Sequence, residues 1–353
     1  MTTGTDRRQF LLGGVAATAA VNGLGFPGFA FAQGATIRAT HFGGPYQVLN
    51  EIIAKPYAEK TKNRVIYDAE ISPTIFPKIQ TQLNNPPFDV VMFSRAWGLR
   101  AMKAGLLQKV SGSDFAETKN LMKDVLPAGG WGVSIMMDTM DIMVDTKQVT
   151  QPITSWMDLW RPDLKGKIML PSSTEGSTAF AFLSCIIRAV SGGSITDQAG
   201  VNEAFARLKA LKPNLRGFFS DGTQPNILIE RGDVAVVPQY AVRIANTTRK
   251  APHVKKASPK EGMLAVPYDL CIPKNAKNVA AIKEYINFTL TKSVQESIAK
   301  SLLATPVRSD VTIPAEVAPL VNSDPKLLWF MDAEYAALKE REWLDRYTRE
   351  IQS

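Results

Sequence analysis

The chain has 353 residues, 45% of them hydrophobic and 21% charged, and its formal net charge at pH 7 is +8. This length suits about two domains, and the composition is that of an ordinary globular protein. The basic residues are scattered, and Arg249-Lys250 and Lys255-Lys256 form only short clusters. Proteins that bind nucleic acids usually concentrate their basic residues and interleave them with aromatic ones, so the charge pattern argues against that class.

The amino terminus has the pattern of an export signal. Arg7-Arg8 precede a mildly apolar stretch at 11–20, and Ala30-Phe31-Ala32 supplies a small-x-small cleavage site. No later stretch reaches the ~18 apolar residues that a membrane-spanning helix needs. We therefore predict that residues 1–32 are a signal peptide of the twin-arginine type, and that the mature chain begins near Gln33 in a bacterial periplasm.

Strand and helix patterns alternate through the first part of the mature chain. Short apolar runs predict strands at 35–39, 65–69 and 89–93, and amphipathic patterns predict helices at 48–60, 73–83 and 96–104. This alternation is typical of a mostly parallel, doubly wound sheet. Between the first strand and helix lie Gly43-Gly44, which allow positive φ angles and a close approach of backbone N–H groups to a guest.

The later part of the chain continues this α/β pattern. Apolar runs at 133–146 and 263–273 predict strands that cross between two lobes, and shorter runs predict strands at 166–170 and 233–237. Helices are predicted at 179–190, 201–211, 224–230, 241–247, 279–289, 293–301 and 326–348. Pro238-Gln239-Tyr240 is typical of a turn, and Ser155 with Asp158 fits a capping box.

Cys185 and Cys271 are the two cysteines of the sequence, and both lie in apolar runs. An oxidising compartment permits a disulfide between them. We expect two buried free thiols instead, because the two runs are predicted as a helix and a strand of different lobes.

Several segments, taken in order, resemble the spermidine/putrescine-binding group of extracellular solute-binding proteins of ABC importers. Residues 42–47 are similar to the group's aromatic-Gly-Gly-x-Tyr-Gln turn, and 155–167 to its Ser-Trp-x-Asp-Leu-Trp-x-Pro-x-x-Lys-Gly segment. Residues 230–234 resemble its Gly-acid-Val step into a strand. Residues 272–278 and 286–288 resemble its second crossover and the helix that follows.

The resemblance implies an α/β type II periplasmic binding fold, with two doubly wound sheets joined by crossing hinge strands. Lobe 1 would comprise 34–140 and 270–306, and lobe 2 would comprise 141–269 and 307–353. It also implies that a small solute, a polyamine or another amine-bearing compound, is captured between the lobes without a cofactor. A monomer would then deliver the solute to the permease subunits of an inner-membrane ABC transporter.

The same resemblance supplies the candidate ligand-binding residues. They lie in the glycine turn, after the strand at 89–93, in the loop before the helix at 179–190, after the strand at 233–237 and in the second crossing strand: Phe42, Gly43, Gly44, Tyr46, Ser94, Arg95, Thr174, Glu175, Gln239, Tyr240, Tyr268 and Asp269.

Some of these residues have an alternative structural role. Ser94 fits a helix cap, Arg95 fits a partner for a surface carboxylate of the protein, and Glu175 completes a Ser-x-x-Glu capping box. The polyamine group places an acid five residues before the proline of its second crossover, where this chain has Tyr268. Asp269 follows it, and neighbours along a strand point to opposite faces, which leaves polyamine specificity open.

Three other functions are considered. Arg95 and the glycine turn would suit a carboxylate or phosphonate, so a small anionic or zwitterionic solute is the main alternative. A ferric-ion site is less supported, because Tyr240 has no adjacent tyrosine. A periplasmic enzyme is least supported, because the sequence has two histidines and neither a Gly-x-Ser-x-Gly nor a His-Glu-x-x-His motif.

Overall fold

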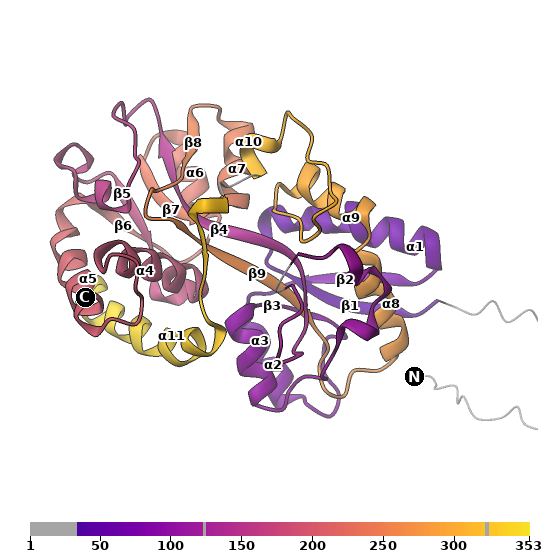
Figure 1. Ribbon diagram of the computed structural model, residues 1–353. Helices are drawn as coiled ribbons and strands as arrows, with labels where there is room; N and C mark the ends of the chain where they lie inside the picture. The colour runs from indigo at the N-terminus through magenta and orange to yellow at the C-terminus, as the bar shows by residue number, and fades with distance from the viewer. Residues whose placement is uncertain (1–33, 123–124, 322–324) are drawn as a thin grey trace, which may run out of the picture. The chain divides into compact units, whose positions relative to one another are not determined.

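The computed structural model describes residues 34–122, 125–321 and 325–353 (Figure 1). The predicted signal peptide lies outside the described residues. From Gly34 to Ser353 the chain forms one compact unit. No helix in the described ranges is long and apolar enough to cross a membrane.

The first part of the chain builds parallel strands with helices between them. β1 (Thr36–His41) pairs with β2 (Arg64–Ala69) in parallel, and α1 (Lys55–Thr61) lies between them in sequence. α2 (Ser72–Thr81), β3 (Val91–Ser94) and α3 (Arg95–Lys103) follow. A parallel bridge between Ala39 and Val90 sets β1 beside the start of β3, so the loops after both strands open at the same edge.

Two long strands link this region to the rest of the fold. β4 (Val133–Asp145) pairs antiparallel with β9 (Met263–Cys271) over its first half, and its second half pairs with β7 (Val236–Tyr240) and β8 (Val254–Ala257). β9 ends beside β3 and begins beside β10 (Leu328–Phe330). The predicted crossing strands are therefore present, and both run through the middle of Figure 1.

The second sheet continues from β7 to β5 (Ile168–Pro171) and β6 (Leu215–Phe219), which run parallel to one another. Its helices, in chain order, are α4 (Ser177–Val190), α5 (Gln198–Ala210), α6 (Gln224–Arg231), α7 (Ala241–Lys250) and the C-terminal α11 (Ala333–Tyr347). The remaining helices are α8 (Val279–Thr289), α9 (Lys292–Ser297) and α10 (Ala318–Val321).

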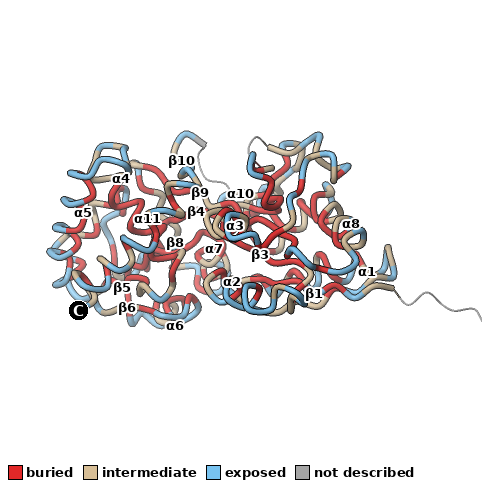
Figure 2. Tube along the Cα trace, turned by 90° about the horizontal axis from the view of Figure 1, so that it is seen from below, coloured by how far each residue is buried: buried red, intermediate tan, exposed pale blue. Residues whose placement is uncertain are grey.

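Two large hydrophobic clusters form the interior, one for each sheet region. The first contains β1, α8 and the start of β4, and the second contains the end of β4, α4, α5 and α11. Figure 2 shows buried stretches inside both regions and exposed ones at their periphery. Cys185 belongs to the second cluster and Cys271 to a smaller one beside α3, and both thiols are free and buried, as predicted.

Several local predictions need correction. The predicted helix at 326–348 is interrupted by strand β10 at 328–330, and α11 starts only at Ala333. The Asp332 carboxylate caps this helix and accepts a hydrogen bond from the Tyr335 N–H at 2.8 Å. The predicted turn at Pro238 to Tyr240 is the end of β7, because pairing with β4 continues to Tyr240 and outweighs the turn preference of proline. Strands β6 and β8 were not predicted.

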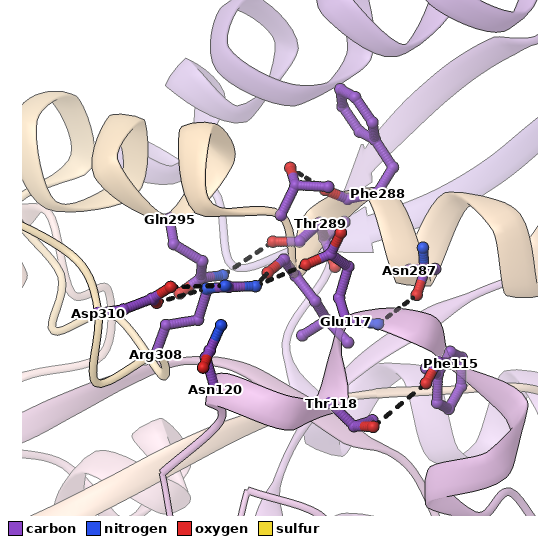
Figure 3. Close-up of polar contacts among 12 residues, drawn as sticks. Phe115, Glu117, Thr118, Asn120, Asn287, Phe288, Thr289, Gln295, Arg308 and Asp310 are labelled. Atoms are coloured by element: carbon purple, nitrogen blue, oxygen red, sulfur yellow. Dashed lines mark hydrogen bonds and ion pairs between the residues drawn. The ribbon is translucent and has the colours of Figure 1, made fainter.

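An ion-pair network fixes the chain where it returns past the first cluster (Figure 3). The Arg308 side chain is 5% exposed and donates to Glu117 at 2.7 Å, to the Leu290 carbonyl at 3.0 Å and to both Asp310 oxygens at 2.8 Å. Arg308 lies just after the predicted lobe boundary at 306, but it contacts Glu117 and Leu290 of predicted lobe 1. The lobe limits themselves stay a prediction.

Candidate functional site

One cavity of about 60 Å³ collects half of the predicted site residues. The predicted residues that line it are Phe42, Tyr46, Ser94, Glu175, Tyr240 and Tyr268. The other lining residues are Ile71, Ser72, Pro73, Ser177, Thr178 and Arg243. They come from the loops after β1 and β2, from the start of α2, from the end of β3, from the loop before α4 and its first turn, from the β7–α7 junction and from β9.

An aromatic wall, defined here as Phe42, Tyr46, Tyr240 and Tyr268, bounds this cavity. Tyr268 is central, with its ring centroid 4.8 Å from that of Phe42, 6.1 Å from Tyr46 and 6.3 Å from Tyr240, all edge to face. Such pairs contribute roughly 0.5–1.5 kcal/mol each beyond their buried area. The wall is thus a rigid apolar surface suited to the methylene groups of a small solute.

The glycine turn at Gly43-Gly44 brings the rings of Phe42 and Tyr46 together in the aromatic wall. Gly43 and Gly44 have φ angles of 68° and 53°, and the Tyr46 N–H donates to the Gly43 carbonyl at 3.1 Å. The Gly43 N–H donates to Nδ1 of His41 at 3.0 Å. His41 therefore has a structural role, and Gly43 shapes the turn while its N–H is occupied within the protein.

A buried carboxylate lies behind the wall and was not predicted as part of the site. Asp138 of β4 accepts hydrogen bonds from the Tyr46 hydroxyl at 3.2 Å, the Val242 N–H at 3.1 Å and the Thr139 N–H at 2.9 Å. Burial raises the pKa of Asp138 to about 6, against the effect of these three donors. The only sequence signal was an acid inside an otherwise apolar run.

Glu175 faces the cavity and does not cap a helix. Ser172 accepts a hydrogen bond from the Thr174 N–H at 3.3 Å, but the Glu175 side chain does not return to Ser172, so the predicted capping box is wrong. Among the described residues the Glu175 carboxylate has no hydrogen bond and no ion pair. Burial raises its pKa, and the charge of Arg243 opposes that rise. A half-buried acid of this kind is available to a ligand.

Arg243 is the charged lining residue that the sequence analysis missed. It lies in the first turn of α7, three residues after the predicted site residue Tyr240. The pattern of this helix is amphipathic. Its Nη1 atom is buried and has no hydrogen-bond partner within the described part of the chain. Sequence alone gave no reason to separate it from an arginine on a solvated helix face.

Four predicted residues are used elsewhere in the fold. Asp269 is fully buried and accepts hydrogen bonds from Ser134 and, at 2.8 Å, from the Trp131 indole. Arg95 donates to Ser134 at 2.6 Å and lies 3.4 Å from Asp269. It therefore pairs with a carboxylate of the protein, as its alternative role predicts, but this carboxylate is buried and not on the surface. The alternation along β9 sends Tyr268 to the cavity and Asp269 to the opposite face.

Gln239 and Thr174 complete that group. Gln239 is 1% exposed, donates to the Gly222 carbonyl at 3.1 Å and accepts from the Tyr240 N–H at 2.9 Å, so its amide links the end of β7 to the loop at Gly222. Thr174 is exposed and lines a separate surface pocket beside α11. Gly44 does not line the cavity, but it lies against Arg243.

A second cavity of about 420 Å³ lies beyond Ser94, Ser177 and Tyr240, which line both spaces. The Ser94 and Ser177 hydroxyls are 3.4 Å apart. The walls of this second cavity are mainly apolar, and its charged lining residues are Arg95, Asp332 and Glu340. Within residues 34–122, 125–321 and 325–353, no three His, Cys, Asp or Glu side chains are grouped to hold a metal ion.

Residues 53–328 match the family of bacterial extracellular solute-binding proteins. The spermidine/putrescine-binding periplasmic protein of Escherichia coli K12 is 26% identical over 302 residues, which cover 82% of each chain. The gamma-aminobutyric acid-binding protein of Pseudomonas aeruginosa is 25% identical over 291 residues, which cover 81% of this chain and 80% of the relative. An ABC transporter substrate-binding protein from Bradyrhizobium japonicum has a TM-score of 0.76 at 18% identity, covering 90% of this chain and 100% of the other.

These matches confirm the resemblance drawn from the sequence and the two-lobed α/β fold that it implied. Members of the family bind solutes for transport and work with membrane permeases; they are not enzymes. The spermidine/putrescine-binding relatives are periplasmic proteins, which confirms the predicted compartment. The chain therefore belongs to the bacterial extracellular solute-binding proteins, as the periplasmic substrate-binding component of an ABC importer.

Proposed function

We propose that this chain captures a small amine-bearing solute in the cavity between Glu175 and the aromatic wall. The observation that carries the proposal is the half-buried Glu175 carboxylate, which lines the cavity and has no hydrogen-bonding or ionic partner among the described residues. An ammonium group removed from water needs such a partner, because an unpaired buried ion costs several kcal/mol. The rings of the wall pack against the carbon chain of the same solute.

The relatives support an amine as the common feature of the ligand. One is named for spermidine and putrescine and another for gamma-aminobutyric acid, and all three compounds carry a primary amine. A polyamine would need a second acid in the cavity. Tyr268 occupies the position where the polyamine group has one, and Asp269 is engaged with Ser134 and Trp131 on the other face of β9.

The proposed capture includes closure of the two lobes around the solute. The Ser94 and Ser177 hydroxyls belong to different predicted lobes and approach to 3.4 Å beside the cavity. A solute that touches both lobes favours the closed state. Small-angle scattering at saturating solute then shows a smaller radius of gyration than that of the ligand-free protein. We also expect a monomer, which size-exclusion chromatography with light scattering measures directly.

The test begins with the ligand that the protein acquires in cells. Protein purified from rich medium is denatured, and the released solute is identified by mass spectrometry; the refolded, ligand-free chain is then titrated with putrescine, spermidine and 4-aminobutanoate. Glu175→Gln weakens the binding of any amine by roughly 1.5–3 kcal/mol, the scale of a hydrogen bond to a charged group. Glu203→Gln, at an exposed site on α5, is the control and binds normally. Equal affinity in Glu175→Gln and wild type would refute the proposal.

A further inference from the structure

We propose that Arg243 binds a carboxylate of the solute, and that the solute is therefore a short zwitterionic amino acid and not a diamine. The inference rests on the proposed function, because it concerns the other charged group of the same cavity. The amine-bearing solute would then carry a carboxylate at its other end.

The first observation is an unsatisfied donor. Arg243 lines the cavity, and its Nη1 atom is buried without a hydrogen-bond partner among the described residues. Buried polar groups in folded proteins are nearly always paired, and leaving one unpaired is destabilising. The guanidinium is planar and carries donors in a fixed fork that matches a carboxylate.

The second observation is the space kept around the guanidinium. A methyl group on Gly44 would lie 3.1 Å from Arg243 Nη1, and one on Gly222 would lie 3.1 Å from its Cζ and 3.2 Å from Nε and Nη2. Gly44 also needs its positive φ of 53° for the turn. Gly222 has no positive φ, and the nearest atoms that a methyl group there would meet all belong to Arg243. Two loops thus flank the guanidinium closely without contributing an acceptor.

The third observation concerns the acids nearby. Glu175 and Arg243 line the same cavity, and the charge of Arg243 lowers the pKa of Glu175. The two side chains nevertheless form no ion pair. Asp138 already accepts hydrogen bonds from Tyr46, Val242 and Thr139. Asp221, whose charge also raises the pKa of Glu175, accepts hydrogen bonds from the N–H groups of Thr223 and Gln224. An arginine present only to neutralise Glu175 would contact it directly. The separation instead leaves room for a molecule that offers an ammonium to Glu175 and a carboxylate to Arg243.

The charges of the lining favour one type of solute. The cavity is lined by one acid, Glu175, and one base, Arg243, and its other lining residues are uncharged. A short diamine would bring its second ammonium against the Arg243 guanidinium, and a short diacid would bring a carboxylate against Glu175. Like charges in a poorly solvated site repel strongly, so a zwitterion is the complementary class.

Titration calorimetry on the refolded, ligand-free chain tests the inference. The probes are glycine, β-alanine, 4-aminobutanoate and 5-aminopentanoate, with putrescine and succinate as the diamine and diacid of matched length. At least one amino acid binds more tightly than putrescine and succinate. Arg243→Gln weakens that amino acid roughly 10- to 150-fold, and Arg243→Lys, which keeps the charge but loses the fork, weakens it less.

Two further variants separate a binding role from a folding role. Gly222→Ala leaves every charge in place and crowds the guanidinium, so it also weakens the amino acid. Arg249→Gln removes an exposed arginine of the same helix α7 and leaves affinity unchanged. Thermal unfolding of each variant, followed by circular dichroism, verifies that the folded state is retained.

Two results would overturn the inference: putrescine binding more tightly than every amino acid, or an amino-acid affinity that Arg243→Gln does not change. In either case, the proposed function would still hold if Glu175→Gln bound the amine-bearing solute more weakly than wild type. Failure of every amine-bearing probe to bind would instead overturn the proposed function, and the inference with it.

Discussion

Asp138 makes the stability of this protein depend on pH in a direction opposite to that of most carboxylates. Burial raises its pKa from 3.8 to about 6, despite hydrogen bonds from Val242, Thr139 and Tyr46, and the nearby Asp141 charge adds to the rise. Between pH 3.8 and about pH 6, the Asp138 carboxyl is protonated in the folded state but has lost its proton in the unfolded state. The free energy of unfolding therefore falls as the pH rises through that interval.

The size of the effect follows from the same values. A shift from 3.8 to about 6 corresponds to about 3 kcal/mol, at about 1.36 kcal/mol for each pH unit. Asp138→Asn has no charge to lose, and its amide oxygen can still accept from Val242 and Thr139. We expect the variant to gain stability relative to wild type by about 3 kcal/mol between pH 3.5 and pH 7.

Urea denaturation at several pH values, followed by fluorescence and circular dichroism, measures this difference. Asp233→Asn, at an exposed position before β7, is the matched control for the substitution itself. A difference between Asp138→Asn and wild type that does not vary with pH would refute the reasoning, because the carboxylate would then titrate alike in the folded and unfolded states.

Two other predictions follow from buried groups. Asp269→Ala leaves the Arg95 guanidinium without its carboxylate partner and the Trp131 indole without its acceptor. It should destabilise the fold by about 3–5 kcal/mol in urea denaturation, the scale of a broken buried ion pair, without weakening solute binding in calorimetry; a loss of affinity at unchanged stability would contradict this. Cys185 and Cys271 are buried, and burial raises the pKa of both thiols, so a thiol reagent should label neither in the native protein and both after denaturation. Labelling before denaturation would contradict the described packing.

Those parts of the site that depend on local chain chemistry were predictable. The Gly43-Gly44 pair predicted a turn, and the turn puts Phe42 and Tyr46 on the same wall. Alternation along β9 predicted that Tyr268 and Asp269 point to opposite faces. In each case the deciding interactions lie within a few residues of sequence, so periodicity and turn chemistry carry enough information.

The charged half of the site was not predictable in the same way. Arg243, Gly44 and Gly222 meet in space although about half of the chain separates Gly44 from the other two. Arg243 lies on an amphipathic helix, where an arginine normally faces water. Glu175 had a local explanation, the capping box, and only the tertiary structure shows that its side chain turns to the cavity instead.

Asp138 connects the aromatic wall to the helix that carries Arg243. It lies on β4 just before the strand passes from pairing with β9 to pairing with β7. One carboxylate oxygen accepts from the Tyr46 hydroxyl, and the other accepts from the Val242 N–H in the first turn of α7. Arg243 is the next residue along that turn. The hydrogen bonds that fix the aromatic wall therefore also fix the start of the helix that carries the guanidinium, so the wall and the charged end of the cavity are positioned as one unit by a strand that passes through both sheet regions.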